Sequence, residues 1–322
     1  MKKHYFTKSF AAFCFSVTFV LFLLFSSGCE PTEEYQRTVN LTAPMLSSGL
    51  FEAHTHNGYI AVKDTDTPDC NLTATITARA MTQEDAEKLA HSVEVRLVGA
   101  KNGLAVKIEK PSPLVNKYVS VSLDATVTKK TGLELSTHNG AVKVSDITGD
   151  LNAITHNGSV ELRNVAGSVN TTTHNGKVSA ENIDGPAKLI THNGEIKCSQ
   201  ITGSINLASH NGCITCTQIA GNAEIESHNG NIELGFSESA RKPLDVSVAT
   251  HNGNIDFTAP PDYSAQVDVS TYHGSIDTDL PITVTGKLSK GKLTGTIGTG
   301  EGRLHLETYN GSIDIKKYQT GL

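Results

Sequence analysis

Apolar and polar residues alternate along most of this chain, and the alternating pattern recurs every 18 residues. Each recurring unit contains the tripeptide His-Asn-Gly, which begins with this spacing at residues 138, 156, 174, 192, 210 and 228. Four positions after the histidine stands a β-branched residue, as in Val142, Val160, Val178, Ile196, Ile214, Ile232 and Ile255. Because a polar residue separates it from the next apolar one, each unit is predicted to contain a strand with one buried face.

A second strand follows in each unit. A glycine recurs after the first strand, at 149, 167, 185, 203 and 221, and offers a corner, and a second alternating run leads to the next histidine. One such unit cannot bury its apolar face alone, whereas stacked units form parallel sheets around a shared core. The sequence therefore predicts an all-β fold, a single-chain parallel β-solenoid with coils of 18 residues. The handedness of crossovers between parallel strands favours a right-handed coil.

Residues 38–130 do not follow the 18-residue period. They are predicted to form an N-terminal cap with irregular coils and one short helix at 82–90, whose start at Thr82 resembles a capping box. Strand-like runs in this segment lie at 72–79, 93–98 and 118–127. Residues 131–318 are predicted to form the regular solenoid, with a C-terminal cap in which the last unit, 308–313, closes the end.

The first 28 residues have the pattern of an export signal, with lysines followed by an apolar run at 10–25. The following Ser-Ser-Gly-Cys resembles the lipobox of bacterial lipoproteins, in which Cys29 would be acylated and become the mature N-terminus. Ser26 stands where the lipobox usually has leucine, so plain secretion or a retained anchor is the alternative. Residues 29–37 are polar and are predicted to be a tether to the membrane.

The composition narrows the location and the partners. Removal of residues 1–28 takes away three lysines, so the formal net charge falls from −6 to −9, which argues against nucleic acid as a partner. The expected location is the bacterial cell envelope, with a lipid anchor in the membrane. Because Glu30 rather than Asp follows the cysteine, the outer membrane is expected if the host has two membranes.

Three features together resemble a known family. They are the recurring Asn-Gly-x-Val/Ile-x-Val/Leu strand, the helix in the N-terminal part, and the Gly-rich stretch at 295–302 before the final Thr-Tyr-Asn-Gly-Ser-Ile unit. Over residues 38–318 the chain resembles the bacterial putative-adhesin family, a domain of unknown function. The resemblance implies an envelope β-solenoid without assigned catalytic residues. A histidine before nearly every Asn-Gly is not part of the family pattern.

The His-Asn-Gly corners are the first candidate site. In strand phase the Thr or Ser before each histidine points inward and the histidine points outward. We expect a structural ladder in which Asn139, Asn157, Asn175, Asn193, Asn211, Asn229 and Asn252 bond from coil to coil, with glycine accepting positive φ. The alternative is a metal site for Zn or Cu on the histidine column, formed by His138, His156, His174, His192, His210, His228 and His251.

The cysteines allow a further prediction. Cys213 and Cys216 have CxxC spacing, but an odd spacing on a strand sends the two side chains to opposite faces. Cys216 instead shares an inward column with Cys198, one coil earlier. We expect a pair of buried thiols there, with a disulfide as the alternative in an oxidising compartment.

These observations favour a non-catalytic envelope lipoprotein, an adhesin or a binding scaffold whose partner is a surface glycan, another envelope protein or the same protein. No cofactor is required for such a role. The first alternative is a histidine-ladder metal-binding protein. The second is a β-helix polysaccharide-active enzyme, which would need paired carboxylates. The outward acids and bases of the regular coils are instead spread along the axis, at Asp146, Asp150, Glu161, Arg163, Glu181, Asp184 and Glu195.

Overall fold

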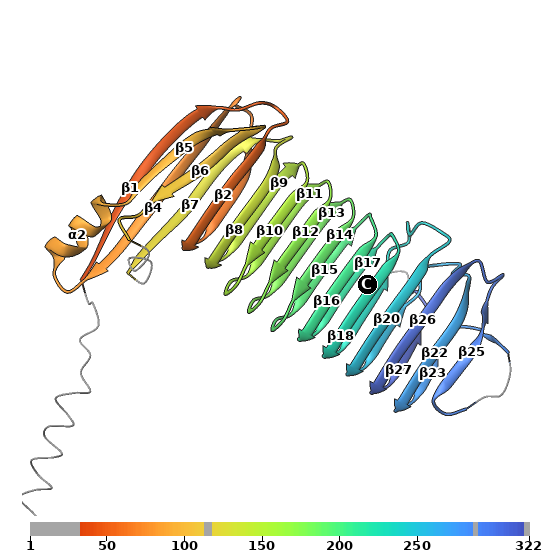
Figure 1. Cartoon of the computed structure of the whole chain (residues 1–322). Coiled ribbons are helices and arrows are strands. Elements are labelled where there is room, and N and C mark those ends of the chain that lie inside the picture. The colour runs from red at the N-terminus through yellow and green to blue at the C-terminus, as the bar shows by residue number, and fades with distance from the viewer. Residues whose placement is uncertain (1–32, 113–117, 286–288, 319–322) are drawn as a thin grey trace, which may run out of the picture.

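The computed structural model describes residues 33–112, 118–285 and 289–318, which form an elongated stack of strands with one helix (Figure 1). The predicted signal, residues 1–28, and the predicted acylation site Cys29 lie outside the described residues. No helix in the described part of the chain is long and apolar enough to cross a membrane.

Two long sheets enclose the core. Sheet A has 13 strands in the spatial order β1 (Glu33–Pro44), β4 (Asp69–Ala80), β7 (Val119–Thr128), β3 (Ile60–Thr65), β9 (Val142–Thr148), β11 (Val160–Ala166), β13 (Val178–Asp184), β15 (Ile196–Ile201), β17 (Ile214–Ile219), β19 (Ile232–Phe236), β21 (Ile255–Thr258), β27 (Ile313–Lys316) and β23 (Ile276–Thr278). Sheet B has 14 strands in the order β24 (Thr283–Val284), β25 (Lys292–Ile297), β22 (Ala265–His273), β26 (Gly302–Asn310), β20 (Asp245–Asn252), β18 (Ala223–Asn229), β16 (Ile205–Asn211), β14 (Ala187–Thr191), β12 (Val169–Thr173), β10 (Leu151–Thr155), β8 (Gly132–Asn139), β2 (Leu50–Asn57), β6 (Gly103–Glu109) and β5 (Glu94–Ala100).

Each regular coil contributes one strand to each sheet, and successive coils pair in parallel and in register. Val160 of β11 pairs with Val142 and Val178, one coil away on either side, and Leu151 of β10 pairs with Val169 in the same way. The aliphatic columns of both sheets are buried and meet between the sheets. The predicted β-solenoid with 18-residue coils is therefore confirmed.

The N-terminal cap is built from antiparallel strands. β1 pairs along its full length with β4, and β4 pairs with β7, which lies beside β3. Helix α2 (Gln83–His91) contacts β4 and β1, and the Thr82 hydroxyl accepts a hydrogen bond from the Asp85 amide at 3.1 Å, as the capping-box pattern predicts. Residues 33–37, which the sequence assigned to the tether, are already part of β1.

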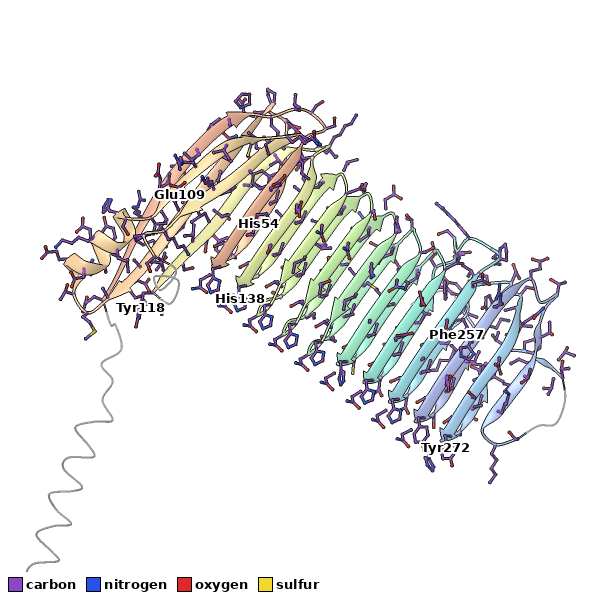
Figure 2. All side chains as sticks on the ribbon, in the orientation of Figure 1. His54, Glu109, Tyr118, His138, Phe257 and Tyr272 are labelled. Carbon is purple, nitrogen blue, oxygen red and sulfur yellow. The ribbon has the colours of Figure 1, made fainter. Side chains whose placement is uncertain are left out.

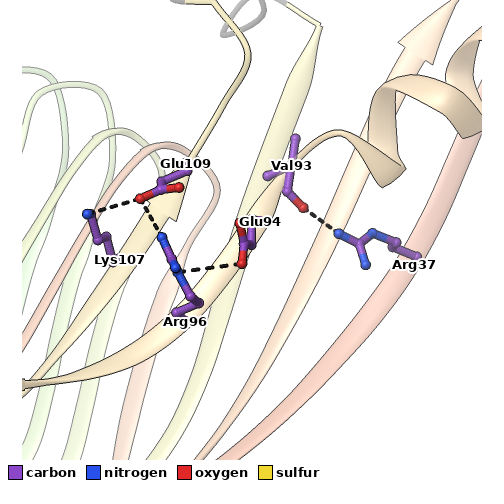
Figure 3. Close-up of polar contacts among 6 residues, drawn as sticks. All are labelled: Arg37, Val93, Glu94, Arg96, Lys107 and Glu109. Atoms are coloured by element: carbon purple, nitrogen blue, oxygen red, sulfur yellow. Dashed lines mark hydrogen bonds and ion pairs between the residues drawn. The ribbon is translucent and has the colours of Figure 1, made fainter.

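Polar contacts fasten this cap (Figure 3). Arg37 of β1 donates hydrogen bonds to the carbonyl oxygens of Ala90 and Val93, at the end of α2. On β5 and β6, the carboxylate of Glu109 lies 2.5 Å from the Arg96 guanidinium and 3.0 Å from the Lys107 ammonium. The hydrogen bond from Lys107 and the charge of Arg96 hold the pKa of Glu109 below its ordinary value.

Two boundaries differ from the sequence-based prediction. β2 and β3 form a regular coil within residues 38–130, since they pair in register with β8 and β9 of the first 18-residue unit. At the other end, the final coil, β26 and β27, does not close the stack. It lies between the coil of β20 and β21 and the coil of β22 and β23, while β24 and β25 extend sheet B beyond it. Strand periodicity identifies a coil but not its place in the stack.

The corner glycines are required by close approach between coils. A Cβ atom on Gly158 would lie 1.8 Å from the carbonyl oxygen of Gly140, and one on Gly176 would lie 1.9 Å from that of Gly158. Of the described His-Asn-Gly glycines, Gly58 alone has φ in the left-handed region, at +120°. The expectation that these glycines accept positive φ is therefore wrong for the regular coils.

Positive φ occurs at Gly167 and Gly185, in the other glycine column, and in a polar column that the sequence analysis overlooked. Asp146, Asn164, Asn182, Gln200 and Gln218 have φ between 53° and 63°, and each lies inside a strand of sheet A. Asn164 donates to Asp146 at 2.7 Å, and Asn182 donates to Asn164 at 2.8 Å. The left-handed residue shifts the alternation, so that two outward positions separate buried residues. In the sequence, this left-handed residue is indicated by buried apolar positions three residues apart instead of two, as in Leu162 and Val165.

A column of inward hydroxyl groups ties each corner to the previous coil. Thr155 donates to the Gly140 carbonyl at 2.9 Å, and the next coils repeat this bond through Thr173, Thr191, Ser209 and Ser227. Thr171 differs, because it is fully buried in the column of Ala153 and Leu189 and its hydroxyl has no hydrogen-bond partner among the residues that the structure describes.

We expect Gly176→Ala to lower the free energy of unfolding by at least about 2 kcal/mol, because the new methyl group would overlap the Gly158 carbonyl and force the coils apart. Urea denaturation followed by circular dichroism measures the change. Gly99→Ala is the control, since nothing lies within 4 Å of a Cβ atom built there. Equal stability of the two variants would contradict the close-approach argument.

Two threonine-to-valine substitutions should have opposite effects. Thr191→Val removes the donor to the Gly176 carbonyl and should lower the free energy of unfolding by about 1 kcal/mol. Thr171→Val replaces an unpaired buried hydroxyl with a methyl group of the same shape and should raise it by about 1 kcal/mol. Urea denaturation of both variants provides the measurement. Changes of the same sign would show that the inward hydroxyl bonds are not what distinguishes the two sites.

Candidate functional site

The corner histidines form a continuous column on the outside of the solenoid. In the coil that contains β10, Thr155 is buried while Ile154 and His156 face solvent, since alternate residues point to opposite sides of a strand. We call the aligned side chains the histidine ladder; it consists of His56, His138, His156, His174, His192, His210, His228 and His251. In Figure 2, the labelled His138 and Tyr272 lie in a row of rings along the edge of the stack, and Tyr272 is the ring at the C-terminal end of the row.

The imidazole rings of the ladder are stacked. Neighbouring ring centroids lie 4.7 to 5.0 Å apart, and most neighbouring rings are parallel to within 4°. His210 is turned out of this alignment, by 39° relative to His192 and 41° relative to His228. Beyond His251 the stack continues through Tyr309 and Tyr272 at 4.9 and 4.8 Å. A flat ring, rather than an imidazole nitrogen, is thus what the stack requires.

The asparagines beside the ladder form the predicted amide column. Each side-chain nitrogen donates to the side-chain oxygen of the preceding coil at 2.7 to 2.9 Å, from Asn139 to Asn310. The acceptor for Asn139 is Asn57 of the first coil. These hydrogen bonds confirm the structural ladder expected from the sequence. Since each amide uses a donor and an acceptor along the stack, the column mainly serves to lock the coils in register.

The ladder geometry does not support metal capture. Two imidazole nitrogens that bind one zinc ion at ~2.1 Å can be at most ~4.2 Å apart. Parallel rings related by a shift of 4.7 to 5.0 Å keep equivalent nitrogens that far apart and aim them in the same direction. Within residues 33–112, 118–285 and 289–318, no group of three or more His, Cys, Asp or Glu side chains is arranged to hold a metal ion.

The ladder borders the outward face of sheet B, which we call face B. The column next to the ladder reads, from β2 to β22, His54, Ser136, Ile154, Thr172, Ile190, Ala208, Glu226, Ala249, Glu307 and Ser270. Ile154 is 47% exposed. A groove of about 500 Å³ runs between this column and the ladder, from His138 to His192. The part of this column from Ser136 to Ala208 is thus an uncharged strip in which Ile154 is exposed and Ile190 and Ala208 are half-buried.

Polar and charged residues occupy the next column of face B, which reads Glu52, Glu134, Asn152, Asn170, Lys188, Asn206, Glu224, Ser247, His305 and Asp268. Asn206 donates to Glu224 at 2.6 Å, and Asn170 donates to Asn152 at 3.3 Å. A second groove, of about 810 Å³, crosses this column toward Arg303. Face B therefore offers two shallow grooves that cross several coils rather than one closed pocket.

The outward face of sheet A carries the acids and bases that would have to form an enzymatic site. Glu161 lies 3.0 Å from Arg163, and Glu195 lies 2.9 Å from Lys197 and 3.3 Å from Lys177. The hydrogen bond from Lys197 lowers the pKa of Glu195, which is the opposite of what a general acid needs. Asp146, Asp150 and Asp184 accept hydrogen bonds from residues one coil away. These carboxylates serve as ion-pair and coil-to-coil partners.

The cysteines lie as the strand phase predicts. Cys213 is exposed, whereas Cys198 and Cys216 are buried neighbours in register on β15 and β17. Their Sγ atoms are 2.8 Å apart, and both are free thiols in this structure. Burial raises the pKa of the Cys216 thiol well above its ordinary value, which keeps it protonated and unreactive.

Acid should weaken the solenoid through the ladder. Two charged imidazoles 4.7 to 5.0 Å apart repel by about 0.9 kcal/mol in water, and an inner ring has two neighbours. Partial desolvation, His138 and Lys110 lower the pKa of His56 below 6.5, so its contribution is present above pH 6.5 and is lost as the pH falls. Glu226 and Glu307, in the adjacent column, offset part of the repulsion.

We therefore expect the urea midpoint to fall between about pH 7.5 and pH 5. A variant with His56 replaced by Gln should show a smaller fall, because it lacks the imidazole whose pKa is lowered by burial and by the neighbouring His138. Equal changes of the midpoint in the two proteins would rule out repulsion within the ladder.

The chain is similar to several proteins of known structure. Three crystal structures resemble the chain, all at low identity and low TM-score. A putative adhesin from Bacteroides fragilis is 13% identical with a TM-score of 0.46, and the match covers 89% of this chain and 99% of that one. A putative lipid binding protein from Parabacteroides distasonis is 13% identical with a TM-score of 0.32, covering 89% and 97%. A putative cell adhesion protein from Clostridium sporogenes is 10% identical with a TM-score of 0.23, covering 88% and 100%.

No curated protein matches the chain. The family model of the Toastrack domain, DUF4097, matches residues 52–249, from β2 through most of β20, which is more than half of the sequence. The matched segment contains most of the first coil, the cap strands β4 to β7 and the regular coils that carry the ladder from His138 to His228. This chain belongs to the Toastrack (DUF4097) family.

Proposed function

We propose that this protein is a non-catalytic, lipid-anchored component of the bacterial cell envelope, an adhesin-type scaffold that binds another molecule along face B. The observation that carries the binding role is the uncharged strip of face B, in which Ile154, Thr172 and Ile190 lie beside the histidine ladder and line a groove of about 500 Å³. A strip of mixed aliphatic and hydroxyl side chains without charges has the composition of a non-obligate interface core, from which charged residues are depleted.

The position of β1 supports the anchoring role. β1 begins at Glu33, four residues after Cys29, so an acyl group on Cys29 would hold the start of β1 within about 14 Å of the bilayer surface. β1 runs in the same direction as β7 and β3, so it starts at the edge of the stack that carries the ladder. The anchor would then hold this edge toward the bilayer, with the long axis of the stack along the membrane surface. Face B would remain accessible along its length in this arrangement.

The two other functions predicted from the sequence lack a comparable observation. The ladder rings run parallel rather than converging on a point, and the outward carboxylates of sheet A are held in ion pairs. A binding scaffold needs neither a metal site nor a reactive carboxylate, so stacked rings and ion-paired acids are compatible with it. Its affinity would come from a few well-placed contacts over a long surface.

We expect Cys29→Ala to move the protein from the membrane fraction to the soluble exported fraction and to abolish labelling with radioactive palmitate, because the thiol that carries the acyl chain is absent. Cys213→Ala is the control, since Cys213 is exposed on a coil far along the chain and should not affect either readout. Cell fractionation with immunoblotting measures the distribution.

Labelling and membrane retention of the Cys29→Ala protein would contradict lipid anchoring. The non-catalytic role fails separately if incubation of the intact protein with envelope polysaccharides releases new reducing ends or unsaturated products.

A further inference from the structure

Face B is complementary to itself when the order of its coils is reversed. Sheet B has equal numbers of strands on either side of the boundary between β14 and β16. A two-fold axis at that boundary, parallel to the strands, would place each column of face B against the same column of a second copy, with the first coil opposite the last. The ten coils from β2 to β22 would then overlap completely.

The column beside the ladder shows the complementarity most clearly. Reversal places Ile154 opposite Ala249 and Ile190 opposite Ala208, so each large aliphatic side chain meets a small one. It places the hydroxyls of Ser136 and Thr172 opposite the carboxylates of Glu307 and Glu226, to which they can donate hydrogen bonds. His54 and Ser270 meet at the ends.

The two flanking columns follow the same rule. In the polar column, Glu134 would face His305, Asn152 would face Ser247, and Asn170 would face Glu224. The exception is the outermost rung, where Glu52 meets Asp268. In the ladder, His138 would face Tyr309 and His56 would face Tyr272, while the inner rungs pair imidazoles, each of which is both a donor and an acceptor when neutral.

The opposite arrangement is disfavoured by charge. If the two-fold axis instead ran along the stack, over the column beside the ladder, each coil would meet its own counterpart and this column would meet itself. Glu226 and Glu307 would then each face the same carboxylate of the second copy, and Ile154 would face Ile154. Like charges placed directly opposite each other oppose association.

The axial repeat also favours a second copy as the partner. A partner that contacts every coil in the same way must have a repeat equal to the strand spacing of ~4.8 Å. Another copy of this solenoid has that repeat, because it is built from the same stacked strands. Ten coils span about 43 Å, and three outward columns span about 17 Å, so each copy would contribute roughly 730 Å². That is close to the ~800 Å² per partner typical of specific interfaces.

We propose that two copies of this chain associate through face B, with coil orders reversed, about a two-fold axis between β14 and β16. The proposal rests on the proposed function in treating face B as the binding surface, and it names the partner as a second copy of the chain. The grooves beside the ladder and across the polar column are then filled by the opposite face.

Site-specific cross-linking tests the arrangement. In the full chain with Cys213→Ser, single variants Ser136→Cys and Glu307→Cys are prepared in membranes and treated with a short bis-maleimide. Within one copy, β8 and β26 are seven strand steps apart, or ~34 Å, so these positions cannot be linked intramolecularly. We expect a cross-linked dimer when the two single variants are co-expressed, and none when either is expressed alone.

Linkage of Ser136→Cys to itself would show the same-order arrangement and overturn the proposal, as would the absence of any dimer in the co-expressed sample. Sedimentation equilibrium of the detergent-solubilised protein provides a second measurement. Ile154→Glu, which would place a carboxylate close to Glu226 of the second copy, should weaken self-association at least tenfold. Ser179→Glu, on the outward face of sheet A, should leave it unchanged.

A monomer in every assay would remove the dimer but leave the palmitate labelling and fractionation of the Cys29 variants unaffected. Failure of self-association is therefore distinguishable from failure of the envelope-anchoring role. Thermal melts of Ile154→Glu and Ser179→Glu, compared with the parent protein, show whether a loss of association reflects unfolding instead.

Discussion

The structure depends on parallel, in-register stacking of coils. Every side chain in a regular coil has the equivalent residue of the next coil as its nearest neighbour along the stack. A residue type therefore suits a column if two identical side chains can lie one strand spacing apart without repulsion or overlap. Asparagine meets this requirement, because its amide donates a hydrogen bond to one neighbour and accepts one from the other. Glycine meets it at the corners, because the backbones of successive coils lie too close together to leave room for a Cβ atom.

The same constraint distributes charge over the surface. A column of one charged residue type would repel itself along its length. In the first regular coils, the outward positions of sheet A pair acids with bases, as in Lys143, Glu161, Arg163 and Glu181. In the last coils the column that begins with Lys143 is acidic, with Glu233, Asp256, Asp314 and Asp277 in register, and Lys316 contacts Asp256 at 2.6 Å. Face B solves the problem differently, with hydroxyl, amide and aliphatic residues in its central coils. Exposed ion pairs contribute little to stability. Their effect on sheet A is to reduce repulsion between like charges in neighbouring coils. Face B does not need them and is free for contact with a partner.

Much of this architecture could be predicted because each coil repeats the same alternation of inward and outward residues. The inward Thr155, the outward His156 and the buried pair of Cys198 and Cys216 all follow from strand phase alone. The positive-φ column at Asp146 and Asn164 was overlooked because an alternation that breaks once in every coil was assigned to a second apolar position, not to a left-handed residue. The positions of the first and last coils depend on long-range pairing, for which spacing carries no information.

The sequence offered no structural reason for histidine in the ladder. The structure shows which roles of the ladder fit its geometry. Tyr309 and Tyr272 continue the stack without imidazole, so flat rings satisfy the packing between coils. An imidazole adds two nitrogens at the ring edge, and parallel stacking prevents neighbouring rings from sharing one ion. Those nitrogens are thus directed away from the stack, where neutral imidazoles can donate and accept hydrogen bonds in alternation. A surface of this kind matches a partner with the same axial repeat better than it matches a single ion or a small molecule, because each rung alone offers little and only the sum over many coils yields affinity.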